Sequence, residues 1–162
     1  MKTVRISMLA LSVIGLAPAS LCAHTILGPA APLCSSEGVP SILVRVGGLQ
    51  SRIGKVRVRT FGGSPDSYFD KKRALKRIEV PVPASGPIDI CMPVPGPGVY
   101  AVDVRHDVNN NGKTDRADGG GVSGNPKVSL LDVIFKRKPP AKQVQVSVGS
   151  GTTVVPIQVR YF

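Results

Sequence analysis

The feature that most constrains the fold of this chain is a repeated alternation of apolar and polar residues with a period of two. Its clearest example is the segment 55–61, in which Val56 and Val58 alternate with three basic side chains. Successive side chains of a β-strand point to opposite faces, so one face of such a strand packs on a core and the other meets solvent. After the first two dozen residues, no apolar pattern of helical period persists over ten residues. The sequence therefore predicts an antiparallel β-protein.

Eight segments carry the pattern of a short strand bounded by turns. They are residues 42–46, 55–61, 78–82, 88–92, 100–106, 128–136, 143–148 and 154–162. The 18 glycines and 15 prolines among 162 residues suit short strands joined by turns better than long helices. Pro81 and Pro83 predict an edge position for the third strand, since proline donates no ladder hydrogen bond. One helical turn is expected over residues 68–76, with Ser67 as its cap. We expect a single all-β domain over residues 41–162, an antiparallel β-sandwich of about seven or eight strands.

Residues 1–23 have the composition of a secretory signal peptide. Lys2 and Arg5 precede an apolar run over residues 8–17, and small residues follow where cleavage is expected. The run is short for crossing a bilayer, so we favour export over a retained anchor or a lipoprotein. The sequence thus predicts a periplasmic or secreted protein, with an extended lead-in over residues 24–40 and no transmembrane segment in the mature chain.

Cys34 and Cys91 are the cysteines that remain once Cys22 leaves with the signal peptide. Export places them in an oxidising compartment, where an even number favours a disulfide; the alternative is two free thiols. Such a bridge would close a loop of about 57 residues and stabilise the fold by roughly 4 kcal/mol in the chain-entropy model.

The most specific motif lies in the long loop 107–127. Counted from its first residue, the loop follows the D-x-N-x-N-G spacing of calcium-binding loops, in which oxygen donors alternate and a glycine allows a sharp turn. The oxygen donors would be Asp107, Asn109, Asn111, Lys113 through its carbonyl, Asp115 and Asp118. Calcium is the one cofactor that the sequence suggests.

Two departures from that motif lower the affinity expected. The twelfth position is an aspartate rather than a glutamate, and the flanks are a strand and a glycine-rich stretch rather than helices. We expect binding on the order of 10⁻⁴–10⁻³ M, as in extracellular modules. The alternative is a metal-free loop of Asx-turns, because Asn and Asp side chains hydrogen-bond their own backbone and Asn111-Gly112 is a strong turn pair.

His106, just before this loop, raises the alternative of a hydrolase, with Asp103 or Asp107 as its partner and Ser123 as the nucleophile. The sequence around Ser123 is not a nucleophile elbow, and the spacing matches no catalytic pattern. A histidine that ends an apolar strand face is expected at the edge of the core. No residue is therefore assigned a catalytic role, and we expect a protein that is not an enzyme.

The chain is strongly basic, with a formal charge of +11 that falls to +9 when Lys2 and Arg5 are removed with the signal peptide. Basic residues gather at 71–77, at 136–138 and on the polar face of 55–61. They form either a solvated surface that protects strand edges or a contact for an anionic envelope polymer such as lipopolysaccharide or acidic polysaccharide. Export and an aromatic content of 4% argue against nucleic acid.

Several segments, in order, resemble the bacterial exported proteins grouped as domain of unknown function 2141. They are the hairpin 44–58, the turn into a strand at 98–102, the His-Asp-x-Asn-x-Asn-Gly-Lys-x-Asp loop at 106–115, the Ser-Gly-Asn-Pro stretch at 123–126 and the closing strand 157–161. The resemblance covers about residues 40–162. It implies an exported immunoglobulin-like or transthyretin-like sandwich without an established activity. The chain departs from the family pattern at residues 119–122, where three glycines and a valine replace a longer Gly-Ile-Pro-x-Glu-Gly-type segment.

Overall fold

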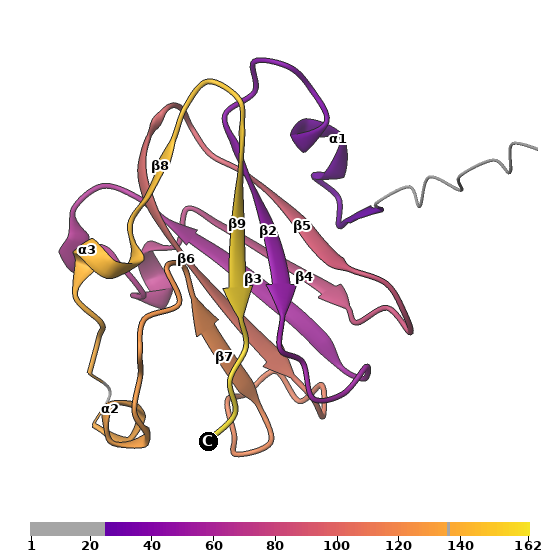
Figure 1. Ribbon diagram of the computed structural model, residues 1–162, viewed down its shortest axis with the longest axis vertical. Helices are drawn as coiled ribbons and strands as arrows, with labels where there is room; N and C mark the ends of the chain where they lie inside the picture. Colours follow the sequence, from indigo (N-terminus) through magenta and orange to yellow (C-terminus); the bar gives the residue numbers. More distant parts are fainter. Residues whose placement is uncertain (1–24, 136) are drawn as a thin grey trace, which may run out of the picture.

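Two β-sheets that share one hydrophobic core make up most of the fold (Figure 1). The structure is a computed structural model that describes residues 25–135 and 137–162, so the predicted signal peptide lies outside the described residues. Within those ranges, no helix has the length and apolar character needed to cross a membrane. The all-β prediction is confirmed at the level of a two-sheet β-rich fold.

The first sheet contains four strands in the order β1-β5-β2-β9. Their bounds are β1 Ile26–Leu27, β2 Ser41–Gly47, β5 Ile88–Pro93 and β9 Thr152–Gln158. Strands β2 and β5 are antiparallel, whereas β1 runs parallel to β5 and β9 runs parallel to β2. The prediction of a purely antiparallel fold is therefore wrong for this sheet. Alternation along one strand fixes which face is buried and carries no information about the direction of its neighbours.

The second sheet is antiparallel throughout and has the order β4-β3-β6-β7, with β8 paired to the beginning of β6. Its strands are β3 Lys55–Phe61, β4 Lys76–Pro81, β6 Gly98–Asp107, β7 Gly119–Val122 and β8 Val146–Val148. Strand β4 is at the edge, as its prolines predict.

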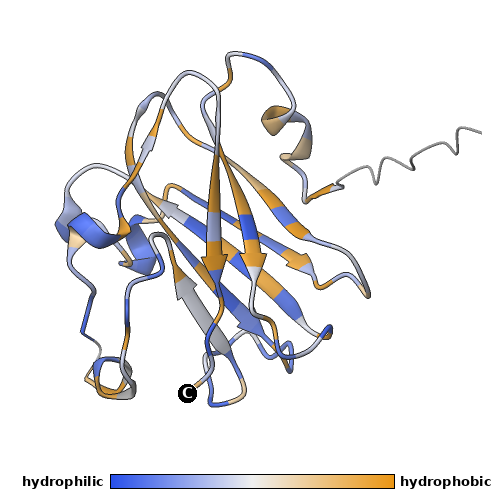
Figure 2. Cartoon of the chain, viewed as in Figure 1, coloured by the Kyte–Doolittle hydropathy of each residue, from blue (hydrophilic) through white to orange (hydrophobic). Residues whose placement is uncertain are grey.

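The core lies between the two sheets and follows the predicted alternation (Figure 2). Val56 and Val58 of β3 are fully buried, as are Ile42 and Val44 of β2. Each such side chain stabilises the fold by about 1.5–3 kcal/mol when it leaves water. The polar residues between them in β3 consequently lie on the outer face of the second sheet, where the candidate site is built.

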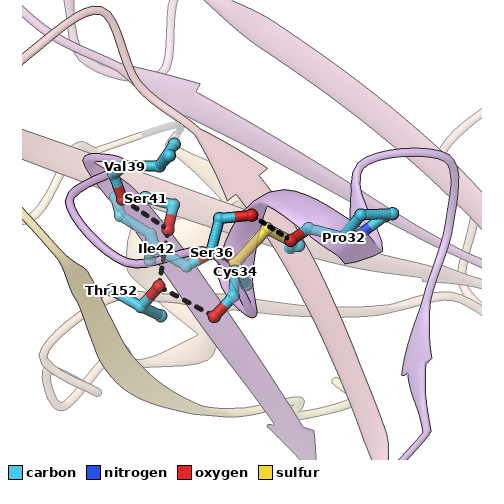
Figure 3. Close-up of a disulfide and its surroundings, with 8 residues drawn as sticks. Pro32, Cys34, Ser36, Val39, Ser41, Ile42 and Thr152 are labelled. Carbon is cyan, nitrogen blue, oxygen red and sulfur yellow. Dashed lines mark hydrogen bonds between the residues drawn. A yellow bond between two sulfur atoms is a disulfide. The ribbon is translucent and has the colours of Figure 1, made fainter.

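A disulfide joins Cys34 to Cys91, with the Cα atoms 5.7 Å apart, as the sequence predicts (Figure 3). It fastens the short helix α1, Ala31–Cys34, to strand β5. Thr152 adds a second fastening, because its hydroxyl donates to the Cys34 carbonyl at 3.0 Å and lies 2.8 Å from the Ser41 hydroxyl. The expected extended lead-in is thus wrong in part, since β1 and α1 dock its residues on the first sheet.

Two predicted strands are replaced wholly or partly by helix. Residues 128–136 contain helix α2, Leu130–Ile134, because the Ser129 hydroxyl accepts from the Asp132 N–H at 3.2 Å and caps the helix. Residues 143–148 begin within helix α3, Ala141–Val144, and only β8 extends as a strand.

The predicted helical turn within residues 68–76 is confirmed as a 3₁₀ turn, η2 Lys71–Arg73, and a second 3₁₀ turn, η1 Pro65–Ser67, precedes it; the predicted cap, Ser67, is wrong. Ser67 lies within η1 and donates its hydroxyl to the carbonyl of Gly62 at 3.0 Å. The cap of η2 is Asp70, whose carboxylate accepts from the Lys72 N–H.

Candidate functional site

The outer face of the second sheet carries rows of charged side chains across its central strands. In one row Arg57 of β3 lies directly opposite Arg105 of β6, and Gly120 of β7 follows on the far side of Arg105. In the neighbouring row Arg59 lies opposite Asp103. Like charges placed directly opposite on a sheet are unfavourable, and nearby carboxylates offset part of this cost: Glu79 of β4 lies opposite Arg57 on its other side, and Asp107 pairs with Arg105.

A groove with a volume of about 1080 Å³ lies on this face. Its floor includes Arg57, Asp103, Arg105 and Gly120, and its sides come from residues 114–119, 125–135 and 137–139 and the C-terminal residues after β9. Figure 1 shows α2 at the lower left, on a segment that projects from the two sheets. Ligand pockets in proteins are usually about 300–1,000 Å³, so the groove is large enough for a small ligand or for part of a polymer.

Arg105 is held firmly in the floor of the groove. Its side chain is 7% exposed, one terminal nitrogen donates to the Asp107 carboxylate at 3.1 Å, and the other donates to the Thr114 hydroxyl at 3.1 Å. The Nε atom is buried and has no hydrogen-bond partner among the described residues. These bonds attach the long loop to β6, so Arg105 is a structural element of the groove as well as part of its charge.

Arg57 is held much more loosely. Its side chain is 15% exposed, its nearest carboxylate oxygen is Asp103 Oδ1 at 3.8 Å, and its Nε is buried without a partner in the described part of the chain. Asp103 is already engaged by Arg59, whose Nε donates at 3.0 Å. The Arg57 side chain is thus mostly buried, and its Nε atom has no hydrogen bond to replace the lost hydration.

Burial lowers the pKa of Arg57 well below its ordinary value, to about 10. The Asp103 carboxylate opposes this shift, and the cationic side chains of Arg59, Arg105 and Arg77 reinforce it. Desolvation and like charge both disfavour the protonated form, whereas a nearby anion favours it. An anion bound in the groove would therefore favour the protonated form of Arg57.

The glycines of β7 serve two different purposes. A Cβ on Gly119 would lie 2.4 Å from a methyl of Val159, and one on Gly121 would lie 2.6 Å from the Gln158 carbonyl oxygen, so both permit close packing on the C-terminal segment. A Cβ on Gly120 would meet nothing nearer than the Val104 carbonyl at 4.0 Å. Gly120 therefore leaves the floor of the groove open beside Arg105.

The loop predicted to bind calcium is closed by hydrogen bonds from its own backbone. The Asp107 carboxylate accepts from the N–H groups of Asn111 and Gly112 at 3.1 and 2.9 Å. The Asp118 carboxylate accepts from the Val108 N–H at 3.2 Å, and the Asn111 side-chain oxygen accepts from the Lys113 N–H at 2.7 Å. These are the bonds of the Asx-turn alternative.

The side chains of Asn109, Asn111 and Asp115 lie close together, and they are joined by hydrogen bonds from the two amide nitrogens to the Asp115 carboxylate. The two side-chain amides donate to Asp115 Oδ2 at 2.7 and 2.8 Å, and the bond from Asn109 is the largest cause of a lowered Asp115 pKa. In the described ranges, no three His, Cys, Asp or Glu side chains form a group that could hold a metal ion. Calcium binding at this loop stays a prediction.

His106 faces the core and not the groove. It is fully buried, and its Nε2 lies 2.7 Å from the Ile53 carbonyl, which only accepts, so Nε2 carries the proton. Nδ1 then accepts from the Tyr161 hydroxyl. Ser123, the nucleophile of the hydrolase alternative, donates its hydroxyl to the Val144 carbonyl. His106 thus anchors the chain at Ile53 and at Tyr161, near the C-terminus, to the second sheet.

Sequence reasoning identified the basic clusters but not the groove that some of them line. Lys71 and Lys72 are exposed on η2 and do not line it, whereas Arg137 and Lys138 do. A usable signal was present in the strand patterns: 55–61 and 100–106 both place arginine on the face assigned to solvent. The pairing that sets Arg57 against Arg105 required the register of β3 and β6.

A bacterial protein family described as uncharacterized and conserved in bacteria (DUF2141) matches residues 44–156. The chain belongs to this family. The match extends from β2 into β9 and includes the floor of the groove and the long loop. The resemblance seen in the sequence is thereby confirmed. No curated protein and no solved structure matches the chain.

Proposed function

We propose that this protein is an exported, non-enzymatic binding protein that takes an anionic polymer of the cell envelope into the groove on its second sheet. The observation that carries the proposal is the pair of facing arginines in the groove floor, of which Arg57 is largely buried and has an Nε atom without a hydrogen-bond partner among the described residues. Guanidinium groups present fixed donors that match carboxylate and phosphate oxygens. An immunoglobulin-like or transthyretin-like type of sandwich is part of the same proposal.

The charge balance of the groove supports an anionic ligand. Six basic and four acidic side chains line it. The acidic ones already accept hydrogen bonds from protein groups: Asp103 from Arg59, Asp115 from Asn109, Asp118 from Val108 and Asp132 from Ser129. The lining therefore carries two more basic than acidic side chains. The predicted signal peptide and the disulfide suit an envelope location, where such polymers occur.

The test is direct binding of lipopolysaccharide and of polygalacturonate to the wild-type protein, to Arg57→Gln and to Lys72→Gln. The two variants lose the same charge, but Lys72 is exposed on η2 outside the groove. We expect Arg57→Gln to weaken binding about tenfold, the value of one charge-assisted hydrogen bond, and Lys72→Gln to change it less than about twofold. Arg105 is left intact because it also holds the long loop.

Equal losses in the two variants would contradict the proposal, because they would mean that the polymers sense only net charge. If neither polymer bound the wild-type protein, the proposal would be contradicted as well. Folding of both variants is checked by their circular dichroism and melting temperatures, so that loss of structure is not read as loss of affinity.

A further inference from the structure

The groove combines a cationic floor with apolar sides. The floor has Arg57 and Arg105, as described above, whereas the sides include Phe69, Val122, Val128, Ile134, Pro139 and Phe162. A site made for a polysaccharide alone would need hydrogen-bonding groups along its sides to replace the water lost from hydroxyls. These six side chains offer none, so the parts of the sides that they form suit hydrocarbon, whereas Thr114, Asn125 and Gln158 supply polar groups elsewhere in the same lining.

Two of the apolar side chains are open to solvent in spite of their size. Ile134 on α2 is 59% exposed and Phe162 at the C-terminus is 49% exposed. Both line the groove, Ile134 from α2 and Phe162 from the C-terminal residues that follow β9. Exposed apolar side chains gathered around a cavity indicate a binding surface more strongly than ones scattered singly over a protein.

Basic side chains accompany these apolar sides. Arg137 and Lys138 follow α2 directly and line the groove, and Arg160 lies two residues before Phe162. The Arg137 guanidinium lies 5.3 Å from the centre of the Phe135 ring. Cationic groups next to apolar ones are the complement of an amphiphile, in which an acidic headgroup adjoins an acyl chain.

We infer that the groove takes an anion that carries an acyl chain, with the headgroup on the arginines of the floor and the chain along Ile134 and Phe162. The inference rests on the proposed function and sharpens it. Of the anionic envelope polymers, the ligand is one whose charged group is joined to a lipid, as in lipopolysaccharide, and not a polysaccharide alone. Each methylene buried in such a site raises the affinity several-fold.

The experiment varies the headgroup charge and the chain length of the ligand independently. Dodecyl phosphate, ethyl phosphate and dodecyl maltoside, each below its micelle concentration, are titrated into the wild-type protein by calorimetry. We expect dodecyl phosphate to bind at least about tenfold more tightly than either of the others, because only it supplies both the charge and the chain. Equal affinity for dodecyl and ethyl phosphate would overturn the inference, and so would equal affinity for dodecyl phosphate and dodecyl maltoside.

Variants on α2 provide a matched control. Ile134 and Leu131 are both 59% exposed on this helix. Ile134 lines the groove, and Leu131 does not. Ile134→Ser is expected to lose most of the gain that the dodecyl chain provides, and Leu131→Ser is expected to keep it. Equal losses in both would mean that the chain binds the surface of α2 and not the groove, and would overturn the inference.

The outcomes separate this inference from the proposed function. If polygalacturonate and ethyl phosphate bind in a manner that depends on Arg57 and the dodecyl chain adds nothing, the inference fails and the proposed function stands. If Arg57→Gln affects none of the anionic ligands more than Lys72→Gln does, both fail.

Discussion

Loss of the Cys34–Cys91 disulfide is expected to remove a large part of the stability of the fold. The bridge closes a loop with a sequence separation of 57 residues. In the chain-entropy model the entropy of the unfolded chain falls by 2.1 plus 1.5R ln n cal/mol/K, which for a loop of this length gives about 4 kcal/mol at 25 °C. Domains of this size are stable by about 5–15 kcal/mol, so reduction leaves the protein marginal.

The assay is urea unfolding followed by circular dichroism, on the same wild-type preparation with and without a phosphine reductant. This comparison introduces no new side chain at Cys91, which is fully buried and whose replacement would add a packing cost of its own. We expect the midpoint to fall and the m-value to rise, since a chain without the cross-link exposes more surface when it unfolds.

A matched control is Thr152→Val, which removes the hydroxyl that holds the Cys34 carbonyl and keeps the disulfide. Its expected cost is about 1 kcal/mol, the value of a typical hydrogen bond. The reasoning would be refuted if reduction of the wild-type protein lowered the unfolding free energy by no more than this control does.

Four further predictions concern single positions. Gly119→Ala should destabilise by about 1–3 kcal/mol in a thermal melt, because its Cβ would meet a C-terminal side chain at 2.4 Å, whereas Gly120→Ala should be nearly neutral. His106→Ala should cost about 2–4 kcal/mol in urea unfolding, since it leaves a cavity and two unpaired polar groups, and a cost near zero would contradict its anchoring role. Arg57→Met should raise the unfolding free energy by about 1 kcal/mol at pH 7. This gain should shrink as the pH rises through 10, where native Arg57 loses its proton before the unfolded chain does. A rise of the wild-type melting temperature in millimolar calcium that Asp107→Asn abolishes is expected if the loop binds the ion, whereas an unchanged melting temperature would favour the Asx-turn alternative, in which backbone N–H groups occupy Asp107.

The parts of the fold that the sequence predicts are those decided by neighbouring residues. Alternation identified β3 and the core valines of β2, because the side-chain period of a strand is a local property. Pro81 and Pro83 placed β4 at an edge, because a missing N–H donor is also local. The pairing of Cys34 with Cys91 followed from the count of cysteines in a chain that is expected to be exported.

The predictions that were wrong concern segments whose local signals are ambiguous. Residues 128–136 are apolar on both sides, and a short apolar run of this kind does not distinguish a buried strand from a helix. Strand β7 was predicted as loop, because Gly119, Gly120 and Gly121 carry no side chains that could alternate. Its place beside β6 depends on close packing against the C-terminal segment, which a local pattern does not contain.

The sequence by itself determined the class of fold, the disulfide and the presence of arginine on the polar faces of two strands. Only the tertiary structure decided that Arg57 faces Arg105, that Gly120 leaves the space beside them open, and that Ile134 and Phe162 line its sides. The physical reason is that burial and like-charge repulsion at Arg57 arise from strand register and from segments distant in the chain. Alternation specifies which face of a strand meets the core, whereas the site depends on what is placed against the other face.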